Sequence, residues 1–468
     1  MHKNAGKKIS RLFQTAVLIL MSAQILTGCV WGLLNFSRLQ PFPDTADLVS
    51  LSGSLNLTGD TGIIYPALLI LVRTLTVNGP VLFYHVMYLI QLILAFVSWY
   101  VFAGNVFESG SKLRNAFLAA AVVTNPYAMQ VHLAVLEYSF VSSFAALLVS
   151  YQIRFMREWK NARKCPGLER ALGDISVTSL FWLLIALSRK EFITVGFIPV
   201  LALIITIIKR FVREKGKASV IVWPVIVALA FGGIILMTDS LFRTVERLSP
   251  VASVKRSLYY RVAWNEDFRD RYHWPEYLTS FVDEGMMTHF MNDPGLIRSE
   301  FTEYVTDRLG EEETTEKFWE WGRIAFSRNK KNIVKEILSD MLGYIFAPAK
   351  TEYSLRGCEY PGYAAGNYDV MKQHDPGLTK FYLRYFSMLY IVMAAVSLIV
   401  ALACFVKKSK EERRIKVSLY LPAFLIVMLT SVYYTFLGCN VYDHRKAVFT
   451  TCLWIVCLCF QEFSSQSA

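Results

Sequence analysis

The sequence predicts an all-α, polytopic membrane protein with about ten transmembrane helices. Of its 468 residues, 54% are apolar and only 18% are charged, which is more apolar than an ordinary soluble domain. A helix needs about 20 mostly apolar residues to cross a bilayer. Segments near that length occupy residues 12–34, 80–104, 115–132, 137–154, 174–189, 191–208, 219–241, 384–406, 417–437 and 447–461. The Lys and Arg residues, finally, concentrate in alternate connectors between these segments.

A further apolar stretch, residues 63–77, lies inside the first outer loop, which runs from 35 to 79. It is shorter than most of the other segments and contains Tyr65, Pro66 and Arg73. Short apolar stretches of this kind are typical of re-entrant or interfacial helices. We therefore expect a re-entrant or juxtamembrane helix here that does not cross the membrane.

The distribution of Lys and Arg sets the expected orientation, because cytoplasmic loops of membrane proteins are enriched in them. If the N-terminus is inside, it and the connectors 105–114, 154–173, 209–217 and 407–416 carry 23 Lys and Arg residues, against six in the short outside segments. The arrangement predicts a multi-pass protein of the cell membrane with a cytoplasmic N-terminus. The net charge of +12 is then a topology signal, and no basic patch is left to suggest nucleic-acid binding.

The predicted domains are an N-terminal transmembrane module (1–241), an extracytoplasmic region (242–383) and C-terminal transmembrane helices (384–468). Helical spacing of apolar residues predicts that the extracytoplasmic region is mainly helical. Residues 332–346 have the pattern of an amphipathic helix that could lie along the membrane. The region is long enough to bury a core of its own.

The cysteines give no strong metal or disulfide signal. Most of the eight fall within apolar segments, where a thiol acts as a small apolar side chain. Cys358 and Cys439 fall on the outer side, and the sequence leaves open whether they pair. No paired CxxC motif and no HExxH motif occurs, so a structural zinc site is not expected.

Polar residues from distant parts of the chain are expected at the outer membrane face. They are Asp44 and Asp47 of the first outer loop, Glu137, the Arg189-Lys190-Glu191 junction, and the piece Tyr442-Asp443-His444-Arg445-Lys446. Each also has a structural interpretation, as a helix cap, an interfacial anchor or a polar hairpin, and Glu137 could simply pair with one of the cations. Charges so close to apolar spans are costly, and their convergence favours a functional site.

This mixture of groups suits sugar transfer from a polyprenyl phosphate. The leaving group is an anionic lipid phosphate at headgroup level, which Arg and Lys can stabilise. A carboxylate near the sugar can take the proton from the attacking acceptor hydroxyl as a general base. Attack of this kind in a single displacement inverts the anomeric centre.

Four pieces of the chain also carry a family resemblance. They are Pro43-Asp44, the segment Tyr65-Pro66-Ala67-Leu68-Leu69, Asn125-Pro126-Tyr127 followed by Glu137, and Ser188-Arg189-Lys190-Glu191. Their order over roughly the first 240 residues resembles the GT-C superfamily of membrane glycosyltransferases, of the protein O-mannosyltransferase and aminoarabinose transferase type. The sequence departs from the family in two ways: Thr45-Ala46 separates the two acids, and the large outer region lies between spans.

The resemblance implies roles for the site residues. Asp44 is expected as the general base with Asp47 as the alternative, while Arg189, Lys190 and Arg445 bind the lipid phosphate. Glu137 and His444 position the sugar or orient those cations, and Tyr442 joins them in substrate binding. Some relatives use a divalent cation such as Mg²⁺ or Mn²⁺ at the acidic loop and others do not, and the sequence leaves this open.

The expected partners are a polyprenyl-phosphate-linked sugar donor, an acceptor that is a glycan, a lipid or a protein, and membrane lipid. The compact loops favour a bacterial cell membrane. Three other functions remain open. An outer-face polysaccharide polymerase or ligase would use residues of the long outer loop such as Arg356 or His374. A transporter would be expected to carry charges within its spans, and a membrane assembly protein would have no catalytic site.

Overall fold

The computed structural model describes eleven stretches of the chain together with residue 395. They are residues 2–35, 62–76, 80–107, 111–164, 167–189, 193–215, 250–268, 274–292, 294–297, 300–346 and 376–392. The described residues are helical and contain no strand. They belong to two compact units: one contains the described residues up to Lys215 and those from Phe346 onward, and the other contains residues 250–345.

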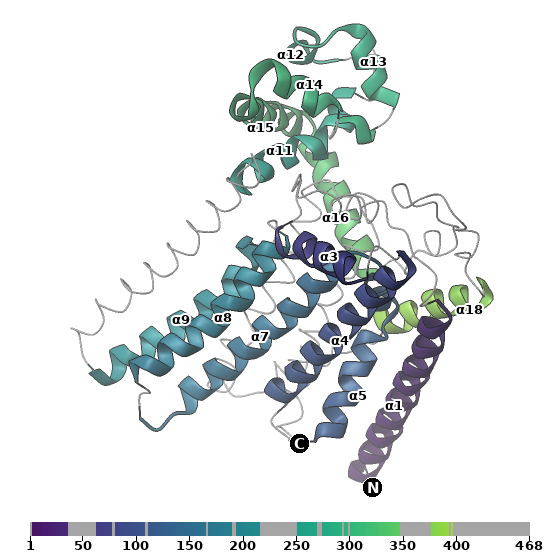
Figure 1. Cartoon of the computed structure of the whole chain (residues 1–468), viewed down its shortest axis with the longest axis vertical. Helices are drawn as coiled ribbons and strands as arrows, with labels where there is room; N and C mark the ends of the chain where they lie inside the picture. Colours follow the sequence, from purple (N-terminus) through teal and green to yellow (C-terminus); the bar gives the residue numbers. More distant parts are fainter. Residues whose placement is uncertain are drawn as a thin grey trace. The chain divides into compact units, whose positions relative to one another are not determined.

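The first unit is built around four long helices that pack side by side (Figure 1). They are α4 (Pro80–Val106), α7 (Tyr138–Asn161), α8 (Leu168–Ser188) and α9 (Ile193–Lys215). Helix α7 is the central one, because it contacts each of the other three. The ring of Tyr151 on α7 stacks on Phe181 of α8, with 5.4 Å between ring centroids.

Three of the described helices are long and apolar enough to cross a membrane: Leu82–Val106, Tyr138–Asn161 and Glu169–Ser188. They match the predicted spans 80–104, 137–154 and 174–189. Helix α1 (His2–Asn35) covers the predicted span 12–34, and α9 covers 191–208. The predicted spans 219–241, 417–437 and 447–461 lie outside the described residues, as does most of 384–406.

The predicted span 115–132 is not one helix, and this prediction was wrong. The structure has α5 (Lys112–Val123) and α6 (Pro126–His132), with a break between them. Proline at a first helical position disfavours helical geometry in the preceding residue, and Asn125 is extended, with ψ of 137°. The Asn125 side chain then caps α6 by accepting a hydrogen bond from the backbone N–H of Tyr127 at 3.0 Å.

The short apolar stretch within the first outer loop forms α3 (Ile64–Leu75). Its 12 residues span about 18 Å at 1.5 Å per residue, which is less than the ~30 Å of a bilayer core. A helix is therefore present where the sequence predicted one, and it is too short to cross a membrane.

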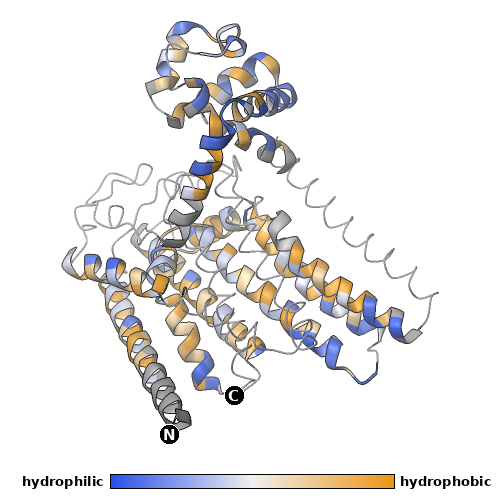
Figure 2. Ribbon diagram, turned by 180° about the vertical axis from the view of Figure 1, so that it is seen from behind, coloured by the Kyte–Doolittle hydropathy of each residue, from blue (hydrophilic) through white to orange (hydrophobic). Residues whose placement is uncertain are grey.

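Basic side chains gather at the end of the first unit where α4 and α7 terminate. Arg157 of α7 donates hydrogen bonds to the backbone carbonyl oxygens of Asn105 and Val106, at 3.1 and 3.0 Å. Arg210 of α9 donates to the carbonyl oxygen of Ala162, just past the end of α7. The last carbonyls of a helix have no partner within it, so these arginines satisfy them. Figure 2 shows hydrophilic residues at this end of α8 and α9.

A last part of the first unit comes from later in the chain. It comprises α18 (Pro376–Phe381) and the π-helical turn η6 (Tyr382–Phe386), and η6 packs against α1 and α6. The Tyr382 hydroxyl donates to the carbonyl oxygen of Thr124, at the break before α6, and its ring contacts that of Trp31. This contact joins two stretches that lie 258 positions apart in the sequence.

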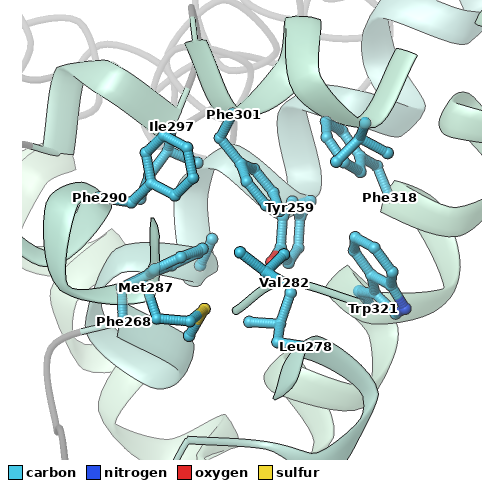
Figure 3. Close-up of a cluster of buried hydrophobic side chains, with 12 residues drawn as sticks. Tyr259, Phe268, Leu278, Val282, Met287, Phe290, Ile297, Phe301, Phe318 and Trp321 are labelled. Carbon is cyan, nitrogen blue, oxygen red and sulfur yellow. The ribbon is translucent and has the colours of Figure 1, made fainter. Parts of the chain in front are cut away.

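The second unit consists of short helices around an aromatic core. Its elements are α11 (Pro250–Ala263), η2 (Trp264–Phe268), α12 (Glu276–Thr279), α13 (Glu284–Asn292), η4 (Pro294–Ile297), α14 (Glu300–Leu309), α15 (Glu311–Arg328) and most of α16 (Lys330–Phe346). Tyr259, Phe301, Phe318 and Trp321 meet at the centre of this core (Figure 3). The helical character predicted for 242–383 is confirmed for the residues that the structure describes there.

Candidate functional site: a buried ion pair where four helices meet

The site is centred on Glu137 and Arg189. Glu137 is the residue just before α7, and Arg189 is the residue just after α8. Nη1 of Arg189 donates to Oε1 of Glu137, and the two side chains are 6% and 1% exposed. The Arg189 guanidinium also lies over the ring of Tyr138, 4.4 Å from its centroid. Glu137 thus balances a buried charge, and Tyr138 adds a cation–π contact.

Gln91 of α4 holds the turn that leads to Glu137. Its Nε2 donates to the carbonyl oxygens of His132 and Ala134, at 2.9 and 2.7 Å. Its Oε1 accepts a hydrogen bond from the Tyr65 hydroxyl of α3 at 2.7 Å. Every one of these groups is buried, so the partners fix which way the amide points. Three segments of the chain are joined by this one side chain.

A second contact closes the same turn. Nδ1 of His132, at the end of α6, lies 2.8 Å from Oγ of Ser139, in the first turn of α7. Both side chains are buried. The turn between α6 and α7 is therefore held from two sides, by Gln91 across the bundle and by His132 within the turn itself. Backbone that leaves the helical form inside an apolar bundle requires such partners.

The start of α3 is fastened to the end of α8 by backbone alone. The N–H of Gly62 donates to the carbonyl oxygen of Ser188 at 3.1 Å, one residue before Arg189. A Cβ at position 62 would overlap the carbonyl oxygen and carbonyl carbon of Leu187. Only glycine allows this approach. Since Gly62 belongs to the first outer loop, this point of the loop lies beside the residue that precedes Arg189.

The structure brings together two of the predicted site residues, Glu137 and Arg189, although 52 positions separate them. The other predicted site residues lie outside the described part of the chain: Asp44, Asp47, Lys190, Tyr442, His444 and Arg445. Their roles stay predictions. In the structure the Arg189 side chain is engaged by Glu137, the arrangement that the sequence left open as simple pairing.

Sequence reasoning missed Gln91 and Ser139. The signal for Gln91 was its place as a lone amide within the apolar run 80–104. An amide placed there must find hydrogen-bond partners inside the protein, because lipid offers none. Ser139 gave no such signal, since small hydroxyl residues are common in packed membrane helices.

The second unit holds a separate polar cluster around Asp267. Its carboxylate accepts hydrogen bonds from the Tyr277 hydroxyl at 2.6 Å and from Nη2 of Arg328 at 2.7 Å. Burial raises the pKa of Asp267 to about 6, and these two partners limit the rise. Burial, with the neighbouring Asp267 charge, likewise raises the pKa of Tyr277. The Asp267 carboxylate is therefore mostly ionised at pH 7, and it takes up a proton as the pH falls through about 6.

Within the described stretches, no three His, Cys, Asp or Glu side chains come close enough to hold a metal ion. Comparisons of the chain with protein-family models, with curated proteins and with solved structures find no match. The residues of the site are therefore the basis on which a function is inferred.

Proposed function

We propose that the protein is an integral membrane glycosyltransferase of the GT-C type. It would transfer a sugar from a polyprenyl-phosphate donor to an acceptor on the extracytoplasmic face, with inversion at the anomeric carbon. The proposal includes about ten membrane spans, a cytoplasmic N-terminus and a helical extracytoplasmic region between the N-terminal and C-terminal spans. The three long apolar helices of the first unit are compatible with this arrangement.

The observation that carries the proposal is the buried pair of Glu137 and Arg189. Ionisable side chains among apolar membrane helices are costly, and they are functional by default. This pair lies where α7 begins and α8 ends, next to the irregular turn after α6. Irregular backbone at membrane depth is tolerated only within protein or beside a polar cavity. Buried charge and interrupted helices thus occur at the same place in the bundle. A binding site would require both features.

The contact of Gly62 with Ser188 relates this pair to the acidic loop. Asp44 and Asp47 precede Gly62 by fewer than 20 residues, and Lys190 follows Arg189 directly. In this proposal the acidic loop and Lys190 would both lie near the ion pair, because Gly62 contacts the residue that precedes Arg189. Glu137 would hold the Arg189 guanidinium in position beside the donor phosphate, and Lys190 would add a second positive charge.

The chemistry assigned to these residues is a single displacement. The acceptor hydroxyl oxygen attacks the anomeric carbon of the sugar while Asp44, or Asp47, removes its proton. The bond from the anomeric carbon to the phosphate oxygen breaks, and its electron pair leaves with the polyprenyl phosphate. Positive charge near the leaving phosphate stabilises the transition state. The products are the glycosylated acceptor and the lipid phosphate, and the proton stays on the carboxylate until it exchanges with water.

The test uses the full chain in lipid nanodiscs with a panel of polyprenyl-phosphate sugars. Turnover and donor-dependent thermal stabilisation are measured for the natural chain, Asp44→Asn, Asp47→Asn and Lys190→Ala. We expect one Asp variant to bind donor without turning it over, and Lys190→Ala to lose much of the stabilisation. Asp60→Asn, in the Gly-rich turn of the same loop, is the matched control and should keep full turnover. If no donor is turned over and none raises the thermal stability, the proposal is overturned.

A further inference from the structure

Helix α16 of the second unit carries two apolar stripes. The first is buried: Ile333 and Ile337 pack against Val262 and Ala325. The second is exposed, with Val334 and Leu338 at 44% and 54% exposure. A single helix that only completed a core would need the first stripe alone. The second stripe needs another partner.

Val334 and Leu338 are four positions apart, so they lie on one side of α16. Lys330, the first residue of α16, also lines an open groove of about 890 Å³. Trp319 and Ile324 of α15 line this groove, and Ile324 is itself exposed. Exposed apolar side chains thus occur on both helices, Ile324 on α15 and Val334 and Leu338 on α16.

Cations border this surface. Lys330 and Lys331 begin α16, Lys335 lies one turn later, and Arg323 lines the groove. All four are exposed, and none forms an ion pair with a described residue. The acidic groups of the groove are already engaged in ion pairs of their own, with Lys255 and Lys317. The border therefore keeps its positive charge.

We propose that this face, formed by α16 and the end of α15, binds the surface of a bilayer that contains anionic lipid. The apolar stripe would enter the boundary between headgroups and acyl chains, and the lysines would reach lipid phosphates. Interfacial helices combine these two features, and each Lys or Arg near an anionic surface strengthens the binding. The inference rests on the membrane character of the chain and not on the proposed sugar transfer.

Two observations favour lipid over another protein as the occupant. The groove also contains Glu316 and Glu320, but both are paired with lysines, and the bordering side chains Arg323, Lys330, Lys331 and Lys335 are all cations, which complement anionic headgroups. The chain also continues from α16 directly into the unit that holds the apolar helices, since Phe346 already belongs to that unit. The C-terminal end of α16 is therefore tethered to a part of the protein that lies in lipid if those helices span a membrane.

The test measures the depth of spin labels on the full chain in nanodiscs. In a chain whose native cysteines are replaced, a label is placed at Leu338 by Leu338→Cys, or at the matched control position by Asn332→Cys. Asn332 is exposed on the same helix, about 200° away from Val334 at 100° per residue. In discs of phosphatidylcholine and phosphatidylglycerol, we expect the Leu338 label to collide several-fold more with oxygen than with a water-soluble nickel complex. The control label should favour the nickel complex.

Two results would overturn the proposal. Equal preference for the nickel complex at both positions would mean that the face is in water. A Leu338 label shielded from both reagents would mean that protein covers it. Hydrogen exchange of the unmodified chain provides a second measurement that needs no substitution. Amides of residues 330–346 should exchange more slowly in discs with phosphatidylglycerol than in phosphatidylcholine alone, and equal exchange would refute the role of charge.

Discussion

Replacing Glu137 by glutamine is expected to be among the most damaging conservative changes in the first unit. Glu137→Gln keeps the size of the side chain and removes its charge. The Arg189 guanidinium then stays buried, at 6% exposure, and loses the carboxylate of Glu137. Breaking a buried pair in this way costs about 3–5 kcal/mol, which is roughly a 150- to 5,000-fold change in the unfolding equilibrium. The cation–π contact with Tyr138 remains and offsets only a small part.

The partner substitution should cost less. Arg189→Gln leaves a buried carboxylate, which can become neutral by binding a proton, whereas a guanidinium cannot lose its charge in a protein. The double variant Glu137→Gln with Arg189→Gln has no buried charge at this position. We therefore expect it to be more stable than Glu137→Gln alone, with a coupling of roughly 2–3 kcal/mol between the two positions.

The measurement is chemical unfolding in lipid–detergent micelles, followed by tryptophan fluorescence. Glu320→Gln is the control, because Glu320 forms an exposed pair with Lys317, at 57% and 41% exposure. Exposed pairs contribute about 0–1 kcal/mol. If Glu137→Gln costs no more than Glu320→Gln, or if the double variant is simply additive, the reasoning about an uncompensated buried charge is refuted.

Three further predictions use the same unfolding assay. Gly62→Ala should destabilise the first unit by about 1–3 kcal/mol, because its Cβ would overlap the Leu187 carbonyl, whereas Gly173→Ala, with open space around it, should be neutral or stabilising. Gln91→Met keeps the volume but leaves a hydroxyl and two carbonyls without their partner, so it should cost roughly 2–4 kcal/mol, and a loss under 1 kcal/mol would contradict the contacts. Since folding raises the pKa of Asp267 from 3.8 to about 6, this group should lower stability by about 2 kcal/mol as the pH rises from 4 to 7, and Asp267→Asn should remove that part of the pH dependence.

Periodicity and hydropathy predicted the long helices of the first unit because each of these helices presents an apolar surface of constant spacing. They failed at residues 115–132, because mean hydropathy does not reflect the backbone restriction that a proline places on the residue before it. Pro126 and its extended neighbour Asn125 end the helix despite the apolar residues on both sides. The Asn-Pro pair was visible in the sequence, and its steric meaning outweighed the hydropathy of the segment.

Helix ends were predicted less well than helix centres. Helices α7 and α9 continue into the basic connectors, to Asn161 and Lys215. Charge marks where a chain leaves the apolar phase, but it does not end a helix, since Lys and Arg are good helix formers. The arginines on these extensions instead cap the carbonyls of neighbouring helices, as Arg157 does for α4.

For the candidate site, the sequence predicted the charged residues and not what holds them. Glu137 and Arg189 stood out because charge next to an apolar span needs a reason. Gln91 and Gly62 act through the backbone of other segments: one donates to two carbonyls of a turn, and the other brings two main chains together. A sequence does not show which backbone atoms a side chain will meet, because those atoms are the same at every position.

The buried contacts of α3 affect both sides of the ion pair. The charged groups lie at helix ends, while Gln91 and Gly62 connect α3 to α4 and α8 through buried contacts. A movement of the first outer loop that displaced α3 would therefore disturb both the turn before Glu137 and the residue before Arg189. In the proposed transferase, a displacement of α3 would change the surroundings of Glu137 and of Arg189 together, because the segment from Gly62 through α3 contacts both sides of the ion pair.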